Sequence, residues 1–150
     1  EQLGETRLPV RLAGDGAGSL VETVAARGED GTVGVLAWNT TLDQSKAAGH
    51  EPLDREVTVA VSGLEPGASY TLRHRRVDEL HSNVASAWGR LREGDQAWPT
   101  DEQWAQLRAA DRLEELEPEA EVTADGDGRV STTFTLPMPG ISLLELRVAG

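Results

Sequence analysis

His81 lies in the segment with the greatest variety of reactive side chains, residues 78–83, which read Asp-Glu-Leu-His-Ser-Asn. A carboxylate, an imidazole and a hydroxyl are the groups that hydrolases combine for nucleophilic catalysis, and the first two can also bind a metal. A catalytic triad is assembled in space from separate elements, and no loop that could form an oxyanion hole is visible. We therefore interpret Asp78, His81 and Asn83 as a structural motif that satisfies backbone groups where a strand ends.

Acidic residues are the next candidates for chemistry. The Asp-Gly-Asp-Gly sequence at 125–128 has the composition of a calcium loop, but the further ligands and the closing glutamate of an EF-hand are missing. An Asp-Gly pair between two strand-like runs is typical of a hairpin turn, which we expect here. The glutamates between 114 and 121 predict a solvated face, because a glycosidase needs two carboxylates held a defined distance apart. The sequence thus predicts no catalytic residue, no metal site and no cofactor.

Tryptophans could recognise carbohydrate. Trp88, Trp98 and Trp104 fall within one region of about 40 residues. Aromatic faces can stack on the apolar faces of sugars, so these three residues are candidates for carbohydrate binding. The same rings could instead form the core of that region, which has few other large apolar side chains. We favour the second interpretation.

The charge of the chain excludes several classes of partner. The formal net charge is −12, which repels nucleic acid and anionic membrane surfaces. No apolar stretch approaches the roughly 20 residues that span a bilayer. The first residues lack the features of a signal peptide, which is expected of a mature chain or of a piece of a longer one. Cysteine is absent, which excludes disulfides but leaves the compartment open.

Short runs of alternating apolar and polar residues, separated by turn residues, indicate β-strands. Strands at this spacing predict a mainly β fold, an antiparallel β-sandwich that occupies residues 1–150 as a single domain. The expected strands are 8–12, 20–26, 32–39, 57–62, 68–77, 121–124, 130–136 and 141–148. The first of these has the weakest pattern.

Tyr70 supports a sandwich of the fibronectin or immunoglobulin type. It follows a Pro-Gly turn at 66–67, which is the arrangement of a tyrosine corner. In that motif the hydroxyl bonds back to an upstream backbone group, so that the ring can be buried without an unpaired polar atom.

Residues 78–118 interrupt the strand pattern and predict a helical insertion. Thr100 and Gln103 form a capping box, and an apolar face follows from Trp104 to Leu113. The three-residue spacing of that face drifts around an α-helix, so we expect a break near Asp111. The insertion is longer than an ordinary loop.

Two strands, 33–38 and 141–146, are apolar at both parities. A strand with one wet face should alternate, so both faces of these strands need a cover. Either the helical insertion supplies it, or a neighbouring domain does. In the second case we expect Leu36, Trp38 and Leu143 at a domain interface, and an apolar patch near Trp38 through which the isolated chain could self-associate.

Several motifs follow one another in an order typical of one enzyme family. They are Leu-x-Trp-Asn at 36–39, Asp-x-x-His-Ser-Asn at 78–83, a segment around Trp88, Pro-Thr-x-x-Gln at 99–103, and Leu-Pro-Met-Pro-Gly-Ile at 136–141. With these motifs, residues 33–146 resemble glycoside hydrolase family 39, which includes β-xylosidases and α-L-iduronidases.

The resemblance implies a β-sandwich that accompanies a (β/α)₈ catalytic barrel. No part of this chain corresponds to the barrel, which holds the catalytic glutamates of the family, so no catalytic residue is carried over. We therefore expect a non-catalytic, C-terminal accessory domain of a β-xylosidase-like glycosidase, with the barrel as its partner. The alternatives are a separate carbohydrate-binding module and a fibronectin-like protein-interaction module.

Overall fold

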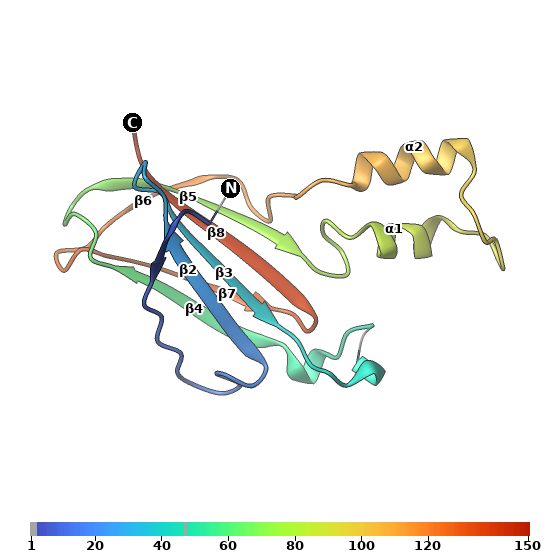
Figure 1. The fold of residues 1–150 in the computed structure, drawn as a ribbon, viewed down its shortest axis with the longest axis horizontal. Coiled ribbons are helices and arrows are strands. Elements are labelled where there is room, and N and C mark those ends of the chain that lie inside the picture. Colours follow the sequence, from blue (N-terminus) through green and yellow to red (C-terminus); the bar gives the residue numbers. More distant parts are fainter. Residues whose placement is uncertain (1–2, 47) are drawn as a thin grey trace.

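The computed structural model describes residues 3–46 and 48–150, and its strands form two antiparallel sheets (Figure 1). The larger sheet has six strands in the order β1-β2-β3-β8-β5-β6, and the smaller has two, β4 and β7. The strands are β1 (Thr6–Leu8), β2 (Val21–Arg27), β3 (Val33–Asn39), β4 (Arg55–Ser62), β5 (Ser69–Val77), β6 (Ala120–Thr123), β7 (Arg129–Leu136) and β8 (Gly140–Val148). Two short 3₁₀ helices, Gln44–Lys46 and Glu51–Leu53, precede β4.

The core lies between the two sheets, because each contributes the apolar half of an alternating pattern. In β4, the residues that face inward are Val57, Val59 and Val61, and they alternate with exposed residues. In the larger sheet, Val35 of β3 lies opposite Leu144 of β8, and both are buried. The buried core consists of Val21, Ala25, Val33, Val35, Ala37, Tyr70, Ala124, Val130, Phe134, Leu136, Leu144 and Leu146.

The mainly β, antiparallel fold with few helices is confirmed, but two local predictions are wrong. The first strand covers Thr6–Leu8, so residues 9–12 are not a strand. Asp125 does not close a hairpin: the turn 125–128 joins β6 of the larger sheet to β7 of the smaller one. Its carboxylate accepts bonds from the amides of Asp127 and Arg129 at 3.0 and 2.9 Å, which is why the Asp-Gly signal resembles that of a hairpin.

The insertion folds into α1 (Val84–Leu91) and α2 (Asp101–Ala110). Asn83 caps α1 by accepting the Ser86 amide at 3.0 Å, and Thr100 with Gln103 forms the expected capping box of α2. The helix α2 ends before Asp111, where the break was expected. Both helices extend beyond the end of β5, away from the sheets (Figure 1). Of the two alternative covers for the apolar strands, the helices of the insertion therefore do not supply one.

Candidate docking face and the predicted site residues

The face of the larger sheet that points away from β4 and β7, here called the outer face, carries an apolar row. Leu36 of β3 lies opposite Leu143 of β8, and Trp38 lies opposite Ile141. On its other side, β8 places Ile141 opposite Val77 of β5. Along β3 and β8, these residues alternate with the residues that face the core. Each strand therefore has one apolar row against the core and a second apolar row on the outer face, which is why its odd and even positions are both apolar.

An open groove of about 650 Å³ lies on the outer face. The expected interface residues differ in their exposure. Leu143 is only 7% exposed and forms part of the lining, whereas Ile141 is 39% exposed, and Leu36 and Trp38 are half-buried. Within the described residues, this side of the sheet is thus only partly covered. The groove is lined by Leu3, Gly4, Glu5, Leu36, Arg75, Val77, Leu113, Ile141 and Leu143.

Glu145 is a fully buried carboxylate on the outer face of β8. One oxygen binds the Arg75 guanidinium at 2.5 Å, and the other binds Arg147 at 3.1 Å. A buried charge is tolerated only when it is paired in this way. Because both oxygens hold guanidinium groups, Glu145 is not available as an acid, a base or a nucleophile. It fixes Arg75, which lines the outer groove.

The Asp78–Asn83 segment forms the turn that leads from β5 into the insertion. One Asp78 oxygen accepts the amides of Leu80 and His81, both at 2.8 Å, and contacts the His81 ring nitrogen at 2.9 Å. Burial opposes the ionisation of Asp78, but these hydrogen bonds outweigh it and leave its pKa below the usual value. Ser82 has a φ of 52° and accepts the Glu114 amide at 2.8 Å. Asp78 and His81 thus bond within their own turn, as short polar side chains at strand ends do.

A polar cluster inside the core was missed by the sequence analysis. His74 and Arg76 of β5 are buried, and both bond the Ser142 hydroxyl, at 2.9 and 2.8 Å. Arg76 also donates to the Thr135 carbonyl at 3.0 Å. The His74 ring packs on the Phe134 ring, with 4.5 Å between the ring centroids. Parity could have located this cluster, because residues 74 and 76 share the parity of the inward-facing Tyr70.

The environment of His74 keeps its ring neutral. Burial is the main cause, and the nearby Arg76 guanidinium adds to it; together they lower the pKa of His74 to about 4. The neutral ring can share a hydrogen with Ser142 without introducing a second charge beside Arg76. The cluster therefore joins β5 to β8 at the end of the core nearest the insertion.

The three tryptophans of the insertion do not share one environment. Trp98 is 78% exposed and Trp104 is 41% exposed, whereas Trp88 is half-buried. The buried residues of α1 and α2 are Ala87 and Leu107. The interpretation that all three rings form the core of the insertion is therefore wrong for Trp98. Their role in carbohydrate binding stays a prediction.

Among residues 3–46 and 48–150, no group of three or more histidine, aspartate or glutamate side chains is placed to hold a metal ion. In the same residues, neither helix has the length and apolar composition needed to cross a membrane.

Solved structures with a similar fold are large glycosidases. The bacterial orthologue of human α-L-iduronidase has 22% identity and a TM-score of 0.65, over 86% of this chain and 22% of that one. The GH39 enzyme from Xanthomonas axonopodis pv. citri has 18% identity and a TM-score of 0.66, with coverages of 85% and 26%. A monomeric β-xylosidase from Caulobacter crescentus has 25% identity and a TM-score of 0.59, with coverages of 85% and 26%.

This chain therefore spans about a quarter of the length of those structures. No protein-family model matches the sequence, and the search of curated proteins finds no match. The likeness shows a fold that occurs as one part of glycoside hydrolases.

Proposed function

We propose that this chain is a non-catalytic accessory domain of a glycosidase related to glycoside hydrolase family 39. Its role is to pack on the (β/α)₈ catalytic barrel through the outer face and to support it. The observation that carries this proposal is the open apolar groove of about 650 Å³ beside Ile141 and Leu36. The similar solved structures support it, since each is about four times as long as the region that it shares with this chain.

The chemistry of the outer face suits a permanent contact inside one protein. Leu36, Trp38, Val77 and Ile141 supply apolar area, and the core of such interfaces is depleted in charge. Arg75, which lines the groove, is paired with the buried carboxylate of Glu145, so a partner would meet this guanidinium already in an ion pair.

The same contacts argue against a catalytic role on this face. Glycoside hydrolysis needs one carboxyl group to donate a proton and a second to act as base or nucleophile. Glu145, the buried carboxylate of the described residues, has both oxygens occupied by guanidinium groups. We propose that the catalytic pair lies elsewhere in the longer protein and that this domain acts by packing.

The test is binding in trans between the isolated chain and the separately produced remainder of the polypeptide. Isothermal titration should give a stoichiometric complex, and Ile141→Glu should weaken it at least thirtyfold, because a carboxylate would be buried unpaired at the contact, at a cost of about 2 kcal/mol or more. Ile141 is partly exposed in the free chain, so this variant should still fold.

Val148→Glu is the matched control, because Val148 lies on the same strand, is more exposed and is outside the groove. It should bind as the unmodified chain does. The proposal is wrong if no complex forms, or if both variants bind with unchanged affinity.

A further inference from the structure

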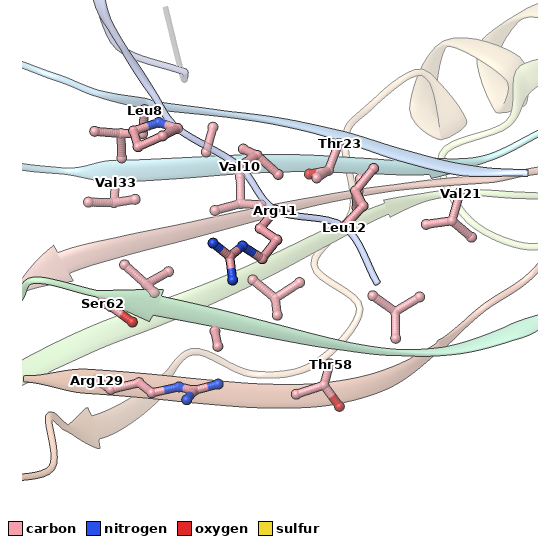
Figure 2. A pocket seen from close by; sticks show the side chains of 18 of the residues that line it. Leu8, Val10, Arg11, Leu12, Val21, Thr23, Val33, Thr58, Ser62 and Arg129 are labelled. Carbon is pink, nitrogen blue, oxygen red and sulfur yellow. The ribbon is translucent and has the colours of Figure 1, made fainter. Parts of the chain in front are cut away.

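A second groove, of about 740 Å³, opens between the two sheets on the side of β4 that faces away from β7 (Figure 2). Its floor is the inner face of β2 and β3, and residues 8–12, which run between that sheet and β4, also line it (Figure 2). The lining residues labelled in Figure 2 are Leu8, Val10, Arg11, Leu12, Val21, Thr23, Val33, Thr58, Ser62 and Arg129.

The groove runs along the edge of β4 rather than beneath the strand. Residues of both parities from Val57 to Ser62 line it, whereas a cavity under a sheet would meet one parity. The described residues pair β4 with β7 alone, so its other edge offers free backbone N–H and C=O groups. This edge has eight residues, about 26 Å at 3.3 Å per residue. Free edges of that length are normally paired or covered.

Along this edge of β4, apolar residues of the core are partly exposed to solvent. Val57, Val59 and Val61 face the core but are only partly buried, although the residues opposite them in the larger sheet are buried. Val10 and Leu12, which also line the groove, are 43% and 40% exposed. Residues 10–12 belong to no strand and pair with neither sheet. The shape that would complete the apolar contacts is a strand with apolar side chains at alternate positions.

Arginine side chains at one end of the groove can bind a negatively charged group. Arg27, at the end of β2, lines the groove, and its Nε is buried without a hydrogen-bond partner. Arg129 lines the same groove, and the Arg11 guanidinium reaches into it (Figure 2). A buried guanidinium donor without a partner is costly, and a carboxylate is the acceptor that suits it best.

We propose that the groove accepts an extended β-strand from a segment of the same polypeptide outside residues 1–150. The strand pairs with the free edge of β4, places alternate apolar side chains on the floor, and presents an aspartate or glutamate to Arg27. This inference rests on the proposed function, which makes the chain part of a longer protein. A strand of the same polypeptide suits the site better than a free partner, because an unsealed core needs permanent cover and a tethered segment is present at high effective concentration.

The test measures binding of two kinds of peptide to the chain by fluorescence anisotropy. The first is a designed octapeptide with valine at alternate positions, threonine between them and glutamate at one end. The second is a set of overlapping twelve-residue peptides from the rest of the polypeptide. The designed peptide should bind and should raise the midpoint of thermal unfolding. One contiguous group of natural peptides should displace it, and these should contain alternate apolar residues and a carboxylate.

Two controls separate strand pairing from general hydrophobic binding. The designed peptide with an N-methyl group on each backbone nitrogen keeps its side chains but has no N–H group to donate to β4, so it should not bind. Replacing its glutamate by glutamine should weaken binding about tenfold, since a hydrogen bond to a charged group is lost. The variant Arg27→Met should remove that preference for glutamate. Arg7→Met, at a position outside the groove, should retain it.

The outcomes distinguish this inference from the proposed function. It is wrong if neither kind of peptide binds, or if the N-methylated peptide binds as well as its parent, even when the outer face still binds the remainder of the protein. If a peptide of residues 55–62, titrated in the same assay, displaces the designed peptide, the groove accepts β4 of a second copy of this chain, and the inference is also wrong. A designed peptide that binds when no natural peptide does would likewise reject the proposed source.

Discussion

His74 should make the stability of this chain depend on pH between about 6.5 and 4. Its pKa is about 4 in the folded chain, against 6.5 when it is free in solution, because the ring is buried and lies beside Arg76. A depressed histidine pKa means that the unfolded chain takes up the proton first. The contribution of the neutral His74 ring to the free energy of unfolding is therefore complete above pH 6.5 and is lost as the pH falls toward 4. At pH 4.5 the difference in pKa corresponds to a loss of about 2.5 kcal/mol.

The pH range in which His74 lowers the stability differs from the range in which the carboxylates do. Asp78, whose pKa is lowered in the folded chain by its hydrogen bonds, loses its contribution mainly below pH 4. Urea unfolding at pH 7.0 and at pH 4.5 should therefore report mostly on His74. His74→Gln keeps an amide that can bond Ser142 but removes the titrating group, so its free energy of unfolding should change much less between the two pH values.

His50→Gln provides the baseline, because His50 lies in the loop before β4 and outside this cluster. The reasoning fails if the His74→Gln chain loses as much stability at pH 4.5 as the unmodified chain. It also fails if the unmodified chain is equally stable at both pH values.

Two further substitutions test the local structure by the same urea measurement. Tyr70→Phe should cost about 1 kcal/mol, because the Glu65 amide, which donates to the Tyr70 hydroxyl at 3.2 Å, loses its partner; an unchanged midpoint would argue against a stabilising role for this bond. Gly128→Ala should cost more than about 2 kcal/mol, since Gly128 has a φ of +67° and an added methyl group would overlap the Leu64 carbonyl. Gly126→Ala, in the same turn but in open space, should change stability by less than about 0.5 kcal/mol, and equal losses in the two variants would contradict this account of the turn.

The strands could be predicted because alternation is a local property. Runs such as 57–62 and 130–136 carry their parity in the sequence, and the observed β4 and β7 agree with them. The capping box at Thr100 could also be predicted, because Thr100 and its partner Gln103 are three residues apart in the sequence. The assignment of strands to sheets was not local. Nothing in residues 125–128 distinguishes a hairpin from a turn between two sheets, so the pairing of β7 with β4 was missed.

The sites were harder to predict than the fold. The second row of apolar residues on β3 and β8 indicated an apolar outer face, but it did not show that Leu143 is buried while Ile141 is partly exposed. The groove beside β4 could not be predicted from the sequence, because it depends on which strands pair, and strand pairing is not a local property. The orphaned donor of Arg27 becomes visible only when the side chains are placed in space.

The central claim is that the outer face of the larger sheet packs on the remainder of a glycosidase. Hydroxyl-radical footprinting tests it directly, because Trp38 lies on that face and Trp98 lies on the projecting insertion. Both rings should react in the isolated chain, since each is at least partly exposed. In the whole polypeptide, the account predicts that oxidation of Trp38 falls sharply while oxidation of Trp98 is unchanged. Equal oxidation of Trp38 in both forms, or protection of Trp98 in place of Trp38, would contradict it.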